Sequence, residues 1–247
     1  MTIKKRGLPA DPRQDFDPVP PPYIAPEDLH TGLAHMGLGS GDLVAALVSL
    51  SSLGRVEGGA DAVLDALLTV LGPSGTLVMP RFVPYVDFRG VYDPRDPPPT
   101  VTGRVVDSLR ARPGAILSPH PSHPVVAAGP QAPAITGGHD RVSPVGVDSP
   151  FDRLARLGGK VLLLGVNQRV NTTIHVGEAH ARVSYWGRPR PDRPAGLWML
   201  DERRDKRWVP LDEVPGDSYG FDQIEPFLEA RGLIRHGRIG RARVRLM

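Results

Sequence analysis

The chain has 247 residues, 40% of them hydrophobic and 23% charged, which is typical of a soluble protein with a substantial core. No run approaches the roughly 18 apolar residues that span a bilayer, and the basic N-terminus leads into Pro9 and Asp11 instead of an apolar segment, so we expect a cytoplasmic protein without a membrane span or secretory signal. The lack of cysteine excludes disulfides, thiolate metal ligands and thiol nucleophiles, and a net charge of +3 without a basic motif argues against a nucleic-acid partner.

The N-terminal segment differs in composition from the rest of the chain. Residues 1–25 are polar and rich in proline, which predicts a flexible arm, and residues 26–247 are expected to form a single domain. The domain begins with a predicted helix over 26–36, where Leu29, Leu33 and Met36 form one apolar stripe.

The next segments predict a βαβ unit. An apolar run from Leu43 to Leu50 predicts a buried strand, and leucines at helical spacing predict a helix over 60–71. Residues 72–75, Gly-Pro-Ser-Gly, end that helix before a strand over 76–79. Two strands joined through a helix pair in parallel, so the sequence predicts an α/β fold.

Less regular segments follow. Residues 81–99 are too rich in proline for a regular element, residues 101–112 and 151–157 are predicted helices, and residues 125–128 a strand. Residues 198–201 and 206–210 predict a hairpin, and residues 223–231 a helix that buries Ile224, Phe227 and Leu228. In the final run, Arg241, Arg243 and Arg245 alternate with apolar residues, so we expect a strand whose arginine face is either solvated or binds phosphates or an acidic partner.

The most informative stretch is 158–178. Residues 161–164 predict a buried strand, after which Asn171 or Thr172 is a candidate helix N-cap. His175 and Glu178 are three residues apart, so they share one face of that helix, and the carboxylate can orient the imidazole as a general base. The Thr172 hydroxyl, three residues before His175, can reach the same place and donate to an oxyanion.

Two plainer interpretations remain open for the histidines. A His–Glu pair at this spacing is often only a polar pair on a helix surface, although the carboxyl end of a strand is where α/β proteins gather functional groups. His120, His123 and His139 could be imagined as zinc ligands, but loop histidines are more often simply hydrogen-bonded, so no metal is predicted.

With these segments placed, the chain resembles the aminoglycoside 3-N-acetyltransferase family from about Asp28 to the C-terminus. The N-terminal matches are Gly41-Asp42, Ser49-Leu50, Gly54, Val56 to Gly59, Gly72 to Thr76, and Met79-Pro80. The later matches are His120-Pro121, Gly129-Pro130, Ser149-Pro150, Gly158 to Lys160, Leu162 to Gly165, Asn171-Thr172, His175 and Glu178.

The resemblance implies a fold, a co-substrate and residue roles. It implies a three-layer α/β/α sandwich with a mostly parallel central sheet, a C-terminal β-rich portion, and acetyl-CoA as the donor to an amine that attacks the thioester directly. By resemblance, His175 is the base, Glu178 orients it and Thr172 stabilises the oxyanion. The residues implied to line the cofactor channel are Ser49, Val56, Gly58, Gly59, Thr76 and His120.

Three positions depart from the family pattern. Leu47 stands where members usually have histidine, Leu117 where they have arginine, and Pro124 where they have serine. Leu47 and Leu117 remove polar groups near the expected thioester and cofactor region. They leave open a carrier-protein thioester as donor, a CoA-independent hydrolysis or cyclisation, or a catalytically silent binding protein.

Charge bears on the acceptor amine. A polycationic aminoglycoside needs carboxylates to pair with its ammonium groups, and a chain with a pI of about 9.4 fits this poorly unless a local cluster such as Asp87, Asp93 and Asp96 supplies them. We therefore expect a small-molecule amine, aminoglycoside-like or a natural-product intermediate, and favour a biosynthetic amine less cationic than an aminoglycoside over a role in antibiotic resistance. An acidic carrier protein and a homodimer are further expected partners.

Overall fold

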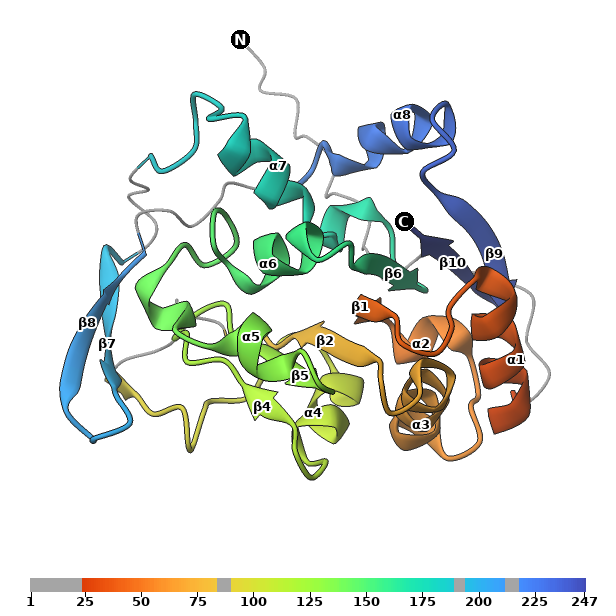
Figure 1. Cartoon of the computed structure of the whole chain (residues 1–247), viewed down its shortest axis with the longest axis horizontal. Helices are drawn as coiled ribbons and strands as arrows, with labels where there is room; N and C mark the ends of the chain where they lie inside the picture. The colour runs from red at the N-terminus through yellow and green to blue at the C-terminus, as the bar shows by residue number, and fades with distance from the viewer. Residues whose placement is uncertain (1–23, 84–89, 189–193, 212–217) are drawn as a thin grey trace, which may run out of the picture.

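The fold starts with the predicted helix and βαβ unit. The computed structural model describes residues 24–83, 90–188, 194–211 and 218–247, so the expected arm lies outside it except for Ile24 and Ala25 (Figure 1). Helix α1 (Pro26–Met36) ends at Gly37, whose φ of 102° suits glycine. Strand β1 (Leu43–Val48), helices α2 (Leu50–Leu53) and α3 (Gly59–Leu71), and strand β2 (Thr76–Pro80) follow, and β1 pairs in parallel with β2.

A seven-stranded sheet forms the middle layer, in the order β4-β5-β2-β1-β6-β10-β9. Its other strands are β4 (Ile116–Leu117), β5 (Val125–Ala128), β6 (Lys160–Leu164), β9 (Arg235–Ile239) and β10 (Ala242–Leu246). β1 is parallel to both β2 and β6, whereas the four outer pairs are antiparallel. The parallel part is thus the three-stranded centre, and the C-terminal strands extend one edge.

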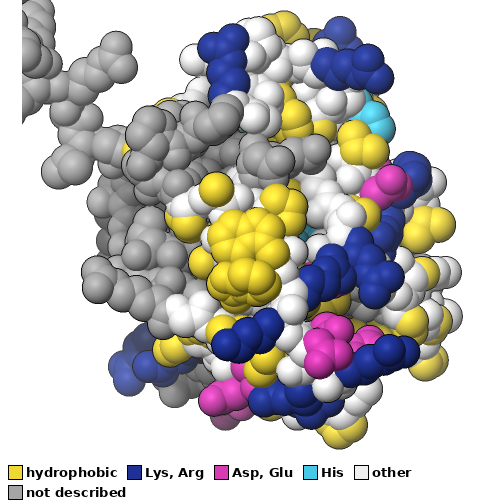
Figure 2. Space-filling view, turned by 90° about the vertical axis from the view of Figure 1, so that its left-hand side faces the viewer, with side chains coloured by type: hydrophobic (Ala, Val, Ile, Leu, Met, Phe, Trp, Pro, Cys, Tyr) yellow, Lys and Arg dark blue, Asp and Glu magenta, His cyan; other side chains and the backbone are white. Residues whose placement is uncertain are grey.

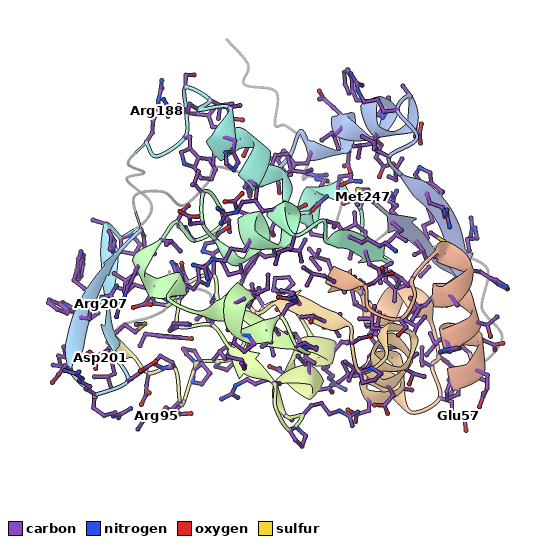
Figure 3. All side chains as sticks on the ribbon, viewed as in Figure 1. Glu57, Arg95, Arg188, Asp201, Arg207 and Met247 are labelled. Carbon is purple, nitrogen blue, oxygen red and sulfur yellow. The ribbon has the colours of Figure 1, made fainter. Side chains whose placement is uncertain are left out.

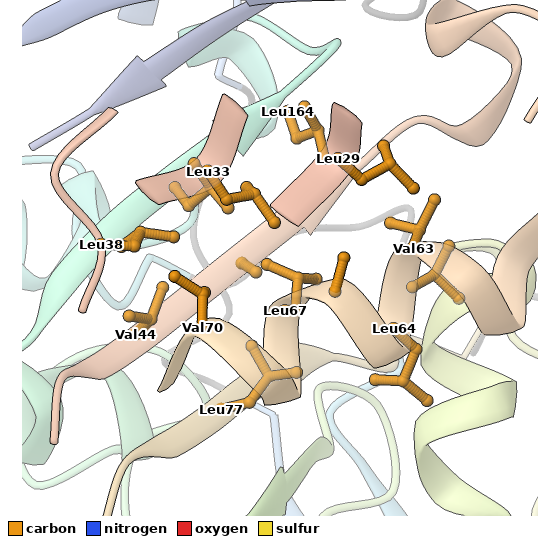
Figure 4. Packing of buried hydrophobic residues seen from close by; sticks show 14 of the residues in the cluster. Leu29, Leu33, Leu38, Val44, Val63, Leu64, Leu67, Val70, Leu77 and Leu164 are labelled. Atoms are coloured by element: carbon orange, nitrogen blue, oxygen red, sulfur yellow. The ribbon is translucent and has the colours of Figure 1, made fainter. Parts of the chain in front are cut away.

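Helices cover both faces of this sheet. On one face, α1, α3 and α4 (Arg104–Arg110) pack on alternate strand residues such as Val44 and Leu77; Figure 4 shows α1 and α3 meeting there. On the other face, α5 (Ala132–Thr136), α6 (Pro150–Arg156) and α7 (Ile174–His180) pack on the intervening residues, among them Ala45 and Val78. Successive side chains of β1 and β2 point to opposite faces of the sheet, so each face has its own hydrophobic core. The predicted three-layer fold is confirmed.

A small second sheet lies at one end of the molecule. It contains β3 (Val91–Tyr92), β7 (Gly196–Leu200) and β8 (Lys206–Pro210), and β7 and β8 form the predicted hairpin. Trp198 and Trp208 face each other across the hairpin at 5.4 Å between ring centroids, and both are exposed. Figure 2 looks onto this side of the molecule and shows an apolar patch beside lysine and arginine side chains. Asp201 and Arg207, labelled in Figure 3, mark this end, away from α7.

Two predictions for the C-terminal region are wrong. The predicted helix over 223–231 is a 3₁₀ turn, η4 (Phe221–Ile224), followed by α8 (Glu225–Glu229), and α8 buries none of its residues, with Phe227 63% exposed. The arginines of β10 do not form a continuous solvated stripe. Arg243 is exposed, but Arg245 is buried, where its Nε pairs with Glu225 and its Nη1 donates to the Val166 carbonyl at 3.0 Å.

No helix among the described residues is long and apolar enough to cross a bilayer.

Candidate active site

The chain segment after β6 positions α7. Gly165, at φ 71°, lets the chain leave the strand where a Cβ would lie 2.6 Å from Ser52 Cβ, and the 3₁₀ turn η3 (Gln168–Val170) leads to Asn171. The Asn171 side chain accepts the Thr173 N–H at 3.2 Å and hydroxyl at 2.6 Å. The N-cap residue is Thr173, whose side chain accepts no N–H of the first turn, so the predicted cap is one or two residues early.

The predicted His–Glu pair is present. His175 Nδ1 lies 2.5 Å from Glu178 Oε2, and both side chains are largely buried, at 9% and 13% exposure. A carboxylate at Nδ1 fixes the tautomer with the proton on that nitrogen, which gives the proton-accepting role to Nε2. The contact is therefore suited to general-base chemistry, and its burial argues against a simple surface pair.

Aromatic rings and a hydroxyl surround the imidazole. Phe221 stands edge-on to His175 at 4.8 Å and Trp186 lies 6.3 Å away, between ring centroids. Thr172 is buried and lines the same cavity as His175, and its hydroxyl donates to the Val170 carbonyl at 3.4 Å. The structure therefore brings the two predicted site residues Thr172 and His175 to one cavity.

Two adjoining cavities lie at the carboxyl ends of β1, β2 and β6. One, of about 320 Å³, contains His175 and Thr172, and the other, of about 740 Å³, contains Ser49. They share five lining residues: Leu47, Pro80, Val101, Thr102 and Val170. Their shared wall makes them one elongated cleft, and it lies at the sheet edge where α/β proteins bind ligands.

The structure brings only some of the predicted cofactor residues to this cleft. Ser49 lines the larger cavity and its Oγ accepts a bond from Ser52 at 2.8 Å. Val56, Gly58 and Gly59 follow the lining residue Gly54 on the same sheet edge, at the start of α3, but do not line the cavity themselves. Thr76 is not near them, because it begins β2 and so lies at the amino ends of the parallel strands. Its Oγ1 accepts the Gln131 N–H at 3.0 Å.

His120 lies in the interior instead of on the cleft wall. Its Nδ1 accepts the N–H groups of Ser122 and His123 at 3.2 and 3.1 Å, and its ring contacts that of His139 in a tilted arrangement, at 4.7 Å between centroids. Burial holds the pKa of His120 well below its usual value and lowers the pKa of His139 to about 3, so both are neutral.

The zinc site considered for His120, His123 and His139 is not among the possible metal sites of the described residues. His139 already bonds the Ser118 hydroxyl through Nδ1 at 2.8 Å and donates from Nε2 to the Pro144 carbonyl at 3.0 Å. Within the described parts of the chain, the side chains close enough to share a metal ion are Glu225, Glu229 and His236, and the first of these is paired with Arg245.

The three departures from the family pattern fall in different places. Leu47 lies on the wall that the two cavities share, where a polar side chain would face the cleft. Leu117 lines a third cavity, of about 850 Å³, between β4 and the β7–β8 hairpin, and the Pro124 carbonyl accepts the Arg81 N–H at 2.8 Å. Only Leu47 therefore bears directly on the cleft, contrary to the expectation for Leu117.

Several residues of the site were missed in the sequence. Tyr185 donates its hydroxyl to Glu178 Oε1 at 2.5 Å, and Phe221 packs on His175 from a distant segment. Asp152 of α6, 2% exposed, bonds His180 at 2.9 Å and so fixes the end of α7. Only the spacing of His175 and Glu178 within one helix gave a local signal.

Comparison with known proteins identifies the family. A family model described as aminoglycoside 3-N-acetyltransferase matches residues 47–247. The chain belongs to the aminoglycoside 3-N-acetyltransferase family. Among curated members, aminoglycoside N(3)-acetyltransferase VII of Streptomyces paromomycinus is 33% identical over 85% of this chain and 82% of its own length, and form VIII of Streptomyces fradiae is 32% identical over 87% and 84%.

Solved structures of family members share the fold. Aminoglycoside acetyltransferase AAC(3)-Xa is 31% identical, with a TM-score of 0.76 over 91% of this chain and 88% of that one. AAC-IIIb in a binary complex with CoASH is 25% identical, also with a TM-score of 0.76, over 92% of each chain. Membership confirms the predicted class: the protein is an N-acetyltransferase with acetyl-CoA as its co-substrate.

Proposed function

We propose that this protein transfers the acetyl group of acetyl-CoA to an amine of a small molecule in one direct step, with His175 as general base. The observation that carries the proposal is the buried contact between His175 Nδ1 and Glu178, on the wall of a cleft at the carboxyl ends of the central strands. Glu178 orients the imidazole, and the Thr172 hydroxyl donates to the thioester oxygen as it becomes negative.

The reaction needs one proton carrier. The amine nitrogen attacks the thioester carbon while His175 Nε2 takes the proton that the nitrogen loses, and the leaving thiolate takes a proton from the resulting imidazolium. The carboxylate of Glu178 stabilises that imidazolium, and its burial strengthens the effect. Phe221 and Trp186 exclude water from the ring.

The larger cavity fits the donor. Its lining is mostly apolar and includes Ser49, Ser51 and Arg104, the first residue of α4. A pantetheine arm would lie along the apolar wall with its thioester toward His175, and Arg104 carries the charge that a phosphate would need. Val56, Gly58 and Gly59 would then lie beside the channel rather than in it.

The acceptor amine enters through the smaller cavity. Two related structures hold aminoglycosides, AAC(3)-IVa with a gentamicin and AAC-VIa with sisomicin, which makes an aminoglycoside the first candidate acceptor. The charged residues among the described lining of the two cavities, Arg104 and Arg169, are both cationic, so a less cationic amine is the second candidate. Of the suggested acidic cluster, Asp93 is paired with Arg204 and lines the third cavity, and Asp87 lies outside the described residues.

The test is release of free CoA thiol from acetyl-CoA with a panel of aminoglycosides and of monoamines that carry a carboxylate, read together with the acetylated products by mass spectrometry. We expect turnover with at least one amine, and a kcat for His175→Ala that is lower by roughly 10² to 10⁴-fold, the usual contribution of a general base. His30→Ala, on the exposed face of α1, is the matched control. Equal rates for the wild type and His175→Ala would contradict the proposal.

A carrier-protein thioester or a CoA-independent hydrolysis or cyclisation is the second candidate. It is favoured by Leu47, which places an aliphatic side chain where the two cavities meet. Acyl transfer from an acetylated carrier protein, with no thiol release from acetyl-CoA, would replace the first proposal by this one.

A further inference from the structure

Glu178 is held from both sides. One carboxylate oxygen, Oε2, contacts His175 Nδ1 at 2.5 Å, and the other, Oε1, accepts the Tyr185 hydroxyl at 2.5 Å. The carboxylate is largely buried, whereas the tyrosine residue is 52% exposed. The phenol therefore covers the carboxylate from the solvent side, and imidazole, carboxylate and phenol form one chain of hydrogen bonds.

The turn after α7 brings Tyr185 back to the helix. Arg182 adopts a left-handed conformation with φ 49°, and the Val183 N–H then bonds the carbonyl of Glu178 itself at 3.3 Å. The Trp186 N–H bonds the Val183 carbonyl at 2.9 Å, which closes the turn around Tyr185. This is the helix-ending pattern in which a left-handed residue reverses the chain. The reversal places the phenol over a residue seven positions earlier.

A donor on the second oxygen has two physical effects. It restricts the Glu178 carboxylate to one orientation, because rotation about the terminal side-chain bond would break both hydrogen bonds at once. It also stabilises the negative form of the carboxylate, so the proton shared with Nδ1 stays on the imidazole. The phenol can keep this role in alkaline solution, because the hydrogen bond to Glu178, burial and the carboxylate charge raise the pKa of Tyr185 to about 12.

We propose that Tyr185 is a positioning residue of the general base: its hydroxyl fixes Glu178 in the orientation that holds His175 ready to accept the proton of the amine. This inference rests on the function proposed above. Tyr185 touches neither of the two cavities, so it acts through Glu178 alone.

Tyr185→Phe removes the hydroxyl and keeps the ring. We expect kcat to fall about tenfold, the order of one lost hydrogen bond to a charged group, with KM for acetyl-CoA unchanged. Tyr92→Phe, in the small sheet away from the cleft, is the matched control and should change kcat less than about twofold.

A double-mutant cycle separates positioning from a general loss of structure. In a Glu178→Gln background, Tyr185→Phe should lower kcat by less than about twofold further, because the carboxylate through which it acts is gone. The same tenfold loss in both backgrounds would mean that the hydroxyl only supports the turn after α7, and it would overturn the inference.

Proton NMR of the substrate-free protein provides a readout independent of turnover. The Nδ1 proton of His175, bonded to a carboxylate, should give a downfield resonance that shifts or broadens in Tyr185→Phe and is unchanged in Tyr92→Phe. An unchanged resonance in Tyr185→Phe would refute the inference even in an active enzyme. A changed resonance in a protein that acetylates no amine would leave the contact standing and contradict the proposed function.

Discussion

Two neutral histidines are buried behind the cleft. The rings of His120 and His139 lie in contact, and the hydrogen bonds of His139 to Ser118 and Pro144 connect the loop before β5 to the loop before α6. A neutral imidazole accepts at one nitrogen and donates at the other, which is how His139 is used here. The pair is therefore a structural element whose protonation would break these bonds.

The pH dependence of stability follows from their pKa values. In the unfolded chain a histidine takes up a proton near its usual pKa of 6.5, whereas folding lowers the pKa of His139 to about 3. Below about pH 6.5 the unfolded state therefore binds more protons than the folded state. The free energy of unfolding is unaffected by this histidine above about pH 6.5, and it falls by about 1.4 kcal/mol per pH unit for each such group as the pH drops toward 3.

His139→Gln should flatten this dependence by one proton, although it also lowers stability at neutral pH by removing two hydrogen bonds. Urea unfolding at about pH 7.5 and about pH 5 measures the difference, and His30→Gln on exposed α1 is the control. An identical loss of stability between the two pH values in wild type and His139→Gln would show that this histidine is not buried in neutral form.

At the scale of elements, the ends of α7 and α8 are held by charged side chains. Asp152 of α6 bonds His180 at the end of α7, and Glu225 at the start of α8 pairs with the buried Arg245 of β10. Because α8 buries no apolar residue, ion pairs such as this one join it to the sheet. When a buried arginine loses its carboxylate partner, no ion pair offsets the free-energy cost of its desolvation.

Glu225→Gln should therefore lower the free energy of unfolding by about 3 kcal/mol. Glu229→Gln, on the same helix, is the matched control: it breaks an exposed 3.0 Å contact with His236 and should cost less than about 1 kcal/mol. Equal losses in the two variants, measured by urea unfolding, would show that burial of the Arg245 pair contributes nothing.

At the scale of the whole molecule, local patterns predicted what local interactions determine. Helix α1 was predicted with its observed bounds because its proline start, its Leu29–Leu33–Met36 stripe and the glycine that follows it are all local signals. The contact of His175 and Glu178 was predictable for the same reason, since both lie on one turn of α7. The direction of parallel strands alone could have shown that Thr76 and Ser49 lie far apart. Thr76 starts β2, whereas Ser49 follows the carboxyl end of β1.

Long-range packing set the remainder. The two arginines in β10 alternate as predicted, but whether an arginine faces solvent depends on what packs there, and Glu225 and Val166 meet Arg245 only in the folded chain. Phe221 reaches His175 from the C-terminal region, and Tyr185 reaches Glu178 only because Arg182 reverses the chain. These contacts complete the site, and nothing in their spacing indicates them.

The central claim is that one cleft holds the acetyl donor and that His175 acts there only as the base. Calorimetric titration of CoA into wild type and His175→Ala tests it most directly, alongside turnover of the same two samples. The account predicts micromolar affinity that agrees within about threefold between them, while His175→Ala loses turnover. No CoA binding to either protein, or binding that disappears with the imidazole, would contradict it.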